Sequence, residues 1–217
     1  MVDVNALKGL SRNSQSLDIP GMTATSNLNA FVERKLFILN CGHVITAYLG
    51  HIFHHRTIYD SVHDTARILP IVEGAMCESS AALLVKYPDL FNSIEQEAYV
   101  QKVLGRFRNP NITDEVQRVA RQPLRKLGQD DRLLGPFTIA LQYKLPVKNL
   151  ALGISAAFMY RNNHDEQAVE MKKIMDAEGV PQTMEKITGL SRDSPGFKEI
   201  TDAWNILQEL VVQVGKG

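Results

Sequence analysis

The chain has 217 residues, a length typical of one domain or of one domain with an appendage, and its 44% hydrophobic fraction is enough for a sizeable core. It carries 24 Lys and Arg against 24 Asp and Glu, so its formal net charge is zero. This balance argues against a general nucleic-acid binder and against a polybasic membrane-surface protein, because both need an excess of positive charge. Two cysteines, Cys41 and Cys77, are too few for a disulfide framework or a four-thiolate metal site, and they indicate a reducing compartment.

The N-terminal segment differs from the rest of the chain. Residues 1–25 are rich in Asn, Gly, Ser and Pro, and we interpret them as a linker or arm, with residues 26–217 as the folded domain. Residues 1–20 lack the hydrophobic core of a signal peptide, and no run of about eighteen apolar residues predicts a membrane-spanning helix. We therefore expect a cytoplasmic protein.

The first predicted helix covers residues 27–49. Apolar residues recur there at three- and four-residue spacing, at Leu28, Phe31, Val32, Leu36 and Leu39. Ser26 or Asn27 is the expected N-cap, and Gly50 is the expected end of the helix.

Helical patterns continue to the C-terminus. Further helices are predicted over residues 70–84, 95–107, 114–121, 131–143, 147–161, 165–178, 182–187 and 197–214, with Thr113 capping the one at 114. Alternating strand patterns are missing, so we predict an all-α fold. No G-x-G-x-x-G follows a predicted strand and no P-loop is present, so the sequence lacks a dinucleotide-binding fingerprint.

Three polar residues, Lys35, Asn40 and His43, stand among apolar neighbours in the first helix. Asn40 and His43 share a helical face, whereas Lys35 would lie about 80° round from His43 and about 12 Å along a regular α-helix. A lysine beside Arg34 under apolar cover should have a lowered pKa and could serve as a general base, while Asn and His could polarise a reacting oxygen. Spacing alone favours the alternative, a surface lysine and two ordinary buried hydrogen-bonding residues.

The sequence segments around these residues resemble those of the polyol-specific long-chain dehydrogenases. The K-x4-N-x2-H pattern is similar to that family's signature, and the surrounding segments resemble the mannitol-1-phosphate 5-dehydrogenases within it. The similar segments, in order, are residues 31–37, 40–43, 46–50, 74–79, 104–107, 121–127, 131–133 and 145–150, within a match from about Ile19 to Leu190.

This resemblance implies a fold and a reaction. Members have an N-terminal Rossmann domain for NAD and a multi-helical C-terminal domain like that of the 6-phosphogluconate dehydrogenases. This chain resembles the second domain alone, with residues 1–25 as the arm from a missing NAD-binding domain, so we expect it to be inactive by itself. The implied reaction interconverts D-mannitol 1-phosphate and D-fructose 6-phosphate with NAD and no metal. Lys35 would be the general acid/base, and Asn40 and His43 would bind the reacting oxygen. Position 41 is usually Thr in such relatives and is Cys here.

A basic run follows in the matched region. Its members are Arg121, Arg125, Lys126, Arg132 and Lys144. On one helix, Arg121 and Arg125 would be four residues apart and could converge on one phosphate. We therefore predict that Arg125 and Arg132 bind the phosphate or the polyol of the substrate, with lesser roles for Arg121 and Lys126. The alternative is a solvated basic face balanced by Asp114, Glu115, Asp130 and Asp131.

Other functions remain open on the sequence alone. Within the family, the rivals are mannitol 2-dehydrogenase and the hexuronate reductases. Outside it, the chain could be a non-catalytic helical interaction module, or a metal-binding protein that uses His51, His54 and His55. We interpret these three histidines, together with His63, as a surface cluster.

Overall fold

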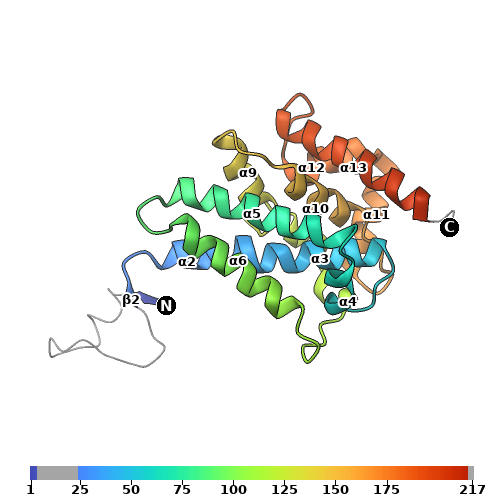
Figure 1. Ribbon diagram of the computed structural model, residues 1–217. Coiled ribbons are helices and arrows are strands. Elements are labelled where there is room, and N and C mark those ends of the chain that lie inside the picture. Colours follow the sequence, from blue (N-terminus) through green and yellow to red (C-terminus); the bar gives the residue numbers. More distant parts are fainter. Residues whose placement is uncertain (4–23, 215–217) are drawn as a thin grey trace.

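The computed structural model describes residues 1–3 and 24–214 (Figure 1). Most of the predicted arm, residues 4–23, lies outside the described residues, so that prediction is not tested. Two short strands, β1 (Val2–Asp3) and β2 (Ala24–Thr25), pair in parallel, and the rest of the regular structure is helical. The prediction of an all-α fold is confirmed, apart from this two-residue pairing.

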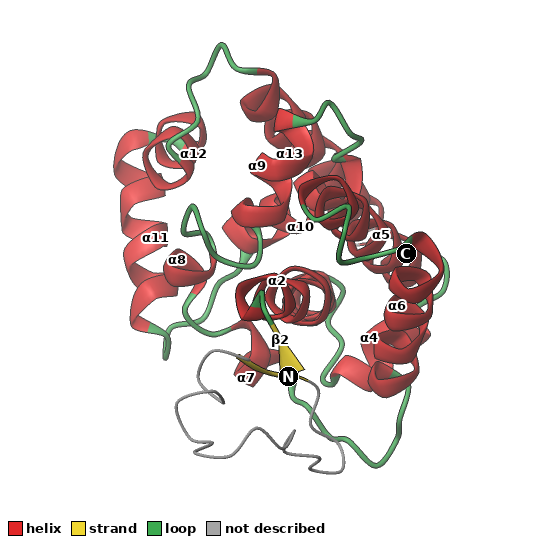
Figure 2. Cartoon of the chain, turned by 90° about the vertical axis from the view of Figure 1, so that its left-hand side faces the viewer, coloured by secondary structure: helices red, strands yellow, loops and turns green. Residues whose placement is uncertain are grey.

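The first helical rod runs through the middle of the molecule (Figures 1 and 2). It consists of α2 (Leu28–Arg34), a π-helical segment η1 (Lys35–Asn40) and α3 (Cys41–Ile52). Asn27 caps it as predicted, because its side chain accepts a hydrogen bond from the Ala30 N–H at 3.2 Å. Gly50 does not end it: the helix continues to Ile52, and a Cβ on Gly50 would lie 2.3 Å from the Ser61 hydroxyl oxygen. This glycine permits close packing.

The remaining helices surround this rod. They are α4 (Ile58–His63), α5 (Ile68–Lys86), α6 (Ser93–Phe107), α7 (Val116–Ala120), α8 (Pro123–Lys126), α9 (Leu134–Gln142), α10 (Lys148–Met159), α11 (Glu166–Glu178), α12 (Val180–Thr188) and α13 (Pro195–Val214). The sequence patterns missed α4 and α8, which are six and four residues long, too short to show a periodic apolar face. The other helices lie close to their predicted ranges.

Helices α3, α5 and α10 pack against one another at the centre, and α7, α9 and α13 each cover one or two of them. Helix α5 is long and apolar enough to cross a membrane by length and composition. Its contacts with α3, α6, α9 and α10 fit a core helix of this domain instead.

One carboxylate joins two of the central helices. Glu78 on α5 accepts hydrogen bonds from the Asn149 backbone N–H (3.0 Å), the Asn149 side-chain amide (2.8 Å) and the Leu150 N–H (2.8 Å). These backbone groups begin α10 and have no partner within that helix. A Cβ on Gly74 would lie 2.4 Å from the Asn149 amide nitrogen, so Gly74 leaves room for this contact. Two sequence segments that carried the family resemblance, 74–79 and 145–150, thus meet in space.

Candidate functional site

The π-helical segment lies where the sequence placed the catalytic signature. Lys35 begins it, Asn40 ends it, and His43 follows in the first turn of α3. The Cys41 N–H donates to the Leu36 carbonyl, a bond over five residues that an α-helix does not make. Single π turns inside α-helices are rare and often occur at functional sites.

This segment changes which residues share a face. A π-helix has about 4.4 residues per turn, so each residue rotates by about 82° instead of the α-helical value of about 100°. Lys35 and Asn40 are then about 50° apart around the axis, where an α-helix would give about 140°. From Asn40 to His43 the helix is α-helical for three residues. Lys35 and His43 are therefore about 10° apart around the axis, whereas a continuous α-helix would place them about 80° apart. The prediction from a straight α-helix was therefore wrong, and the correction favours a common face.

Lys35 is exposed, so the expected apolar cover over its amine is absent among residues 1–3 and 24–214. The neighbouring Arg34 guanidinium lies over the rings of Phe91 and Tyr99, at 5.2 and 4.6 Å from their centroids. Asn40 is half-buried and Cys41 fully buried beside Ser79, with burial raising the pKa of its thiol to about 12. Cys41 is consequently a packing residue rather than a nucleophile.

His43 is the most perturbed of the three signature residues. Its ring stacks on Phe107 at 5.2 Å between centroids, and its Nε2 lies 3.0 Å from Asp114 Oδ2 without the alignment of a good hydrogen bond. Burial lowers the pKa of His43 from 6.5 to about 4, although the Asp114 carboxylate opposes that shift and Arg118 reinforces it. The imidazole is therefore neutral at pH 7 and can exchange hydrogen bonds without carrying charge.

This shift predicts a pH effect on stability. The folded chain holds His43 neutral down to about pH 4, whereas the unfolded chain protonates it near 6.5. The contribution of His43 to the free energy of unfolding is thus fully present above pH 6.5 and is lost as the pH falls through about 4. The total loss of stability from this group is about 3 kcal/mol at most. Urea unfolding between pH 4 and 7 should show a steeper acid loss for the wild type than for His43→Asn. Parallel stability curves would contradict the assignment.

The predicted basic residues gather with His43 around one cavity. This cavity of about 220 Å³ is lined by His43, Arg118, Val119, Arg121, Gln122, Arg125, Lys126 and Arg132. All four predicted phosphate ligands are among its lining residues, whereas Lys144, Lys35 and Asn40 are not. Four guanidinium groups around one small cavity form a site suited to an anion.

The helical structure is interrupted between Arg121 and Arg125. Gln122 has φ of +60°, in the left-handed region, directly before Pro123 at the start of α8. Its N–H donates to Asp165 Oδ2 at 2.8 Å, and the same Asp165 caps α11. Arg121 and Arg125 therefore do not share a helix, and the predicted four-residue spacing on one helix was wrong. They line the same cavity because of this turn.

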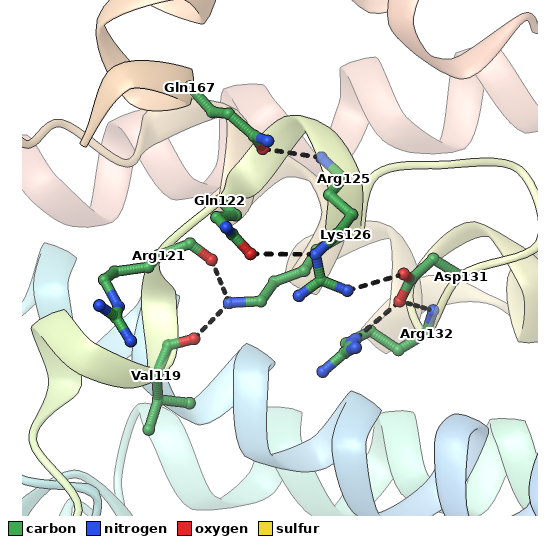
Figure 3. A network of polar contacts seen from close by, with 8 residues as sticks. All are labelled: Val119, Arg121, Gln122, Arg125, Lys126, Asp131, Arg132 and Gln167. Carbon is green, nitrogen blue, oxygen red and sulfur yellow. Dashed lines mark hydrogen bonds and ion pairs between the residues drawn. The ribbon is translucent and has the colours of Figure 1, made fainter.

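Lys126 has a different environment from the arginines. It is 5% exposed, and its amine donates to the backbone carbonyls of Val119 and Arg121 (Figure 3). Burial, reinforced by Arg132 and Arg125, lowers the pKa of Lys126 to about 7. The amine links two carbonyls of the α7–α8 turn while Lys126 also lines the cavity, and its role as a phosphate ligand stays a prediction.

Asp131 pairs with two of the arginines. Its carboxylate lies 3.3 Å from Arg125 Nη1 and 2.7 Å from Arg132 Nε (Figure 3). Part of the basic run is therefore balanced by acids, as the alternative interpretation expected. Asp114, Gln122 and Asp165 also shape the site. The contact of Asp114 with His43 and that of Asp165 with the Gln122 N–H join segments far apart in the sequence, so sequence reasoning missed them.

The histidine cluster lies elsewhere. His51, His54 and His55 line a separate cavity of about 680 Å³, and His55 Nε2 lies 3.3 Å from Asp64 Oδ2. Within residues 1–3 and 24–214, no three His, Cys, Asp or Glu side chains are grouped closely enough to hold a metal ion.

Comparison with known proteins agrees with this architecture. Residues 27–213 match the family model described as the mannitol dehydrogenase C-terminal domain. The chain belongs to this family. Two solved structures have a similar fold. One is the Pseudomonas fluorescens mannitol 2-dehydrogenase in a ternary complex with NAD and D-mannitol (TM-score 0.63, 17% sequence identity). The other is a substrate-free D-sorbitol dehydrogenase (TM-score 0.70, 16% sequence identity). The alignment covers 91% of the present chain for the mannitol 2-dehydrogenase and 89% for the sorbitol dehydrogenase. In both cases the chain spans only 42% of the length of the solved protein.

Proposed function

We propose that this chain is the helical catalytic and substrate-binding domain of an NAD-dependent mannitol-1-phosphate 5-dehydrogenase, which converts D-mannitol 1-phosphate and NAD to D-fructose 6-phosphate and NADH. The observation that carries the proposal is the basic cavity beside His43. Guanidinium groups can hold a phosphate through paired hydrogen bonds, and His43 both lines this cavity and belongs to the signature helix, which supports a phosphorylated substrate at this place.

NAD accepts the hydride in this reaction. Residues 1–3 and 24–214 contain no strand followed by a glycine-rich loop and a helix that would hold its pyrophosphate, so this part of the chain does not form a Rossmann-type site for the cofactor. We propose that a Rossmann domain holds it, and that docking of this domain supplies the cover that the exposed Lys35 lacks.

The residues of this chain would then act on the substrate oxygen. The Lys35 amine takes the hydroxyl proton during oxidation and returns it during reduction. The amide of Asn40 donates to the oxygen as its negative charge develops, and the neutral His43 orients it. Arg125 and Arg132 hold the phosphate at the other end of the substrate, while Asp131 keeps their guanidinium groups in place.

The second candidate is a dehydrogenase for an unphosphorylated polyol. The similar solved structures favour it, because their names are those of mannitol 2-dehydrogenase and sorbitol dehydrogenase. A hexuronate, whose carboxylate is also an anion, is a related option. A non-catalytic interaction module would bind none of these substrates.

Direct binding distinguishes these candidates. We expect the 217-residue chain to bind D-fructose 6-phosphate at least about 10-fold more tightly than D-fructose in isothermal titration calorimetry, because charge-assisted hydrogen bonds contribute about 1.5–3 kcal/mol. Arg132→Gln should remove most of that preference. The matched control is Arg192→Gln, since Arg192 pairs with Glu185 on the surface outside the cavity. Equal affinity for sugar and sugar phosphate would favour the unphosphorylated substrate.

A further inference from the structure

The π-helical segment packs on the segment that carries the basic residues. Phe37 lies in the middle of η1 and is 4% exposed. Its ring covers the backbone of Gly135, where an added Cβ would lie 2.6 Å from Phe37 Cε1 and 2.7 Å from Cζ. Real Cβ contacts are not this short, so the ring can occupy this position only above a glycine.

Gly135 is itself tied to the anion site. It lies in the first turn of α9, and its N–H donates to the carbonyl of Asp131 at 2.8 Å. Asp131 is the carboxylate that pairs with Arg125 and Arg132. One contact between an aromatic ring and a glycine therefore connects the turn that contains Lys35 with the loop that presents the basic residues.

The π turn needs such a support. Local hydrogen bonding favours the α-helix, and a π turn persists where tertiary packing over-determines it. If η1 reverted to α-helical bonding with α3 fixed, Lys35 would rotate by about 90° away from the face of Asn40 and His43. Phe37 would rotate with the same segment and leave its position over Gly135, so this packing opposes the reversion.

We infer that the contact between Phe37 and Gly135 sets the rotation of the π turn, which makes Gly135 a positioning residue for Lys35. The inference rests on the proposed role of Lys35 as the general acid/base. Gly135 touches no substrate in this account, and its effect on the reaction passes through the helix.

The test is Gly135→Ala in the enzyme that pairs this chain with its NAD-binding domain. We expect kcat to fall by about 10- to 100-fold, because the amine is misplaced relative to the oxygen, while the KM for the substrate changes less. The matched control is Gly153→Ala on α10, where the added Cβ meets Ile45 of α3 at 2.5 Å, beyond the π turn. Both variants should lower the melting temperature, but only the first should lower kcat beyond what its stability loss explains.

A second substitution tests the direction of cause. Phe37→Leu removes the two ring atoms that make this contact, so Phe37→Leu alone should also lower kcat. Because the contact is already lost, adding Gly135→Ala to Phe37→Leu should lower kcat by no more than about a further threefold. An equal loss of kcat in Gly135→Ala and Gly153→Ala, or losses from Phe37→Leu and Gly135→Ala that simply multiply in the double variant, would overturn the inference.

A structural measurement keeps this test separate from that of the proposed function. A crystal structure of Gly135→Ala should show the Cys41 N–H bonded to the Phe37 carbonyl, as in an α-helix, in place of the Leu36 carbonyl. If the π bond persists in the variant, the inference is wrong. If the wild-type enzyme oxidises no polyol, the proposed function is wrong, and the structure of the variant still decides whether Gly135 maintains the π turn.

Discussion

Lys35→Met should lower kcat for oxidation of D-mannitol 1-phosphate by about 10³-fold, because it removes the group proposed to take the hydroxyl proton. The measurement is steady-state turnover of an enzyme in which this chain is joined to the proposed NAD-binding domain. Methionine keeps most of the length of the side chain but offers no amine. Since Lys35 is exposed, the free energy of unfolding should change by less than about 0.5 kcal/mol.

Two further measurements separate this chemical role from a general loss of charge. Lys102→Met removes an exposed lysine from α6 and should leave kcat unchanged. In Lys35→Ala, added methylamine should restore part of the activity, because a small amine can enter the space left by the side chain. If Lys35→Met keeps turnover within a few-fold of the wild type, another group carries the proton.

Most of the helices could be predicted because their signals are local. The predicted Thr113 cap was wrong, because α7 begins at Val116 after Glu115, which makes no side-chain cap hydrogen bond. The Asn27 cap and the starts of α6 and α11 depend on residues within one turn, so the sequence alone carries the information. The signature residues and the basic run could likewise be found, because their spacing and order carried the family resemblance. The structure then placed His43 with Arg121, Arg125, Lys126 and Arg132 around one cavity.

The remaining features depend on contacts between distant segments. Gly50 has the residue type of a helix end, yet its neighbours Ser61 and Val116 come from α4 and α7, and they make it a packing position. The π turn leaves no periodic signature over six residues, and its partner Gly135 lies on α9. The Asp114 carboxylate reaches His43 from the loop before α7. Residue spacing along the sequence does not indicate these contacts, because they form only when the helices pack against one another.

Glu78→Ala should lower the free energy of unfolding by about 4 kcal/mol. The substitution leaves the N–H groups of Asn149 and Leu150 and the Asn149 amide without their acceptor at the start of α10. Each unpaired buried donor costs about 1–3 kcal/mol, and the carboxylate also interacts favourably with the N-terminus of that helix. Urea unfolding of the 217-residue chain at pH 7 measures the loss, provided that the m-value is unchanged.

The same helix offers a control for this effect. Glu73 is five residues earlier on α5 and accepts one exposed hydrogen bond from Gln101 at 2.9 Å, so Glu73→Ala should cost less than about 1 kcal/mol. Glu78→Gln keeps one carbonyl acceptor and presents an NH₂ group to the other donor, so its loss should fall between the two alanine variants. Equal losses for Glu73→Ala and Glu78→Ala would contradict the role of Glu78 as the buried link between α5 and α10. A large loss confined to Glu78 would show that this carboxylate fixes the helix pair against which α3 packs.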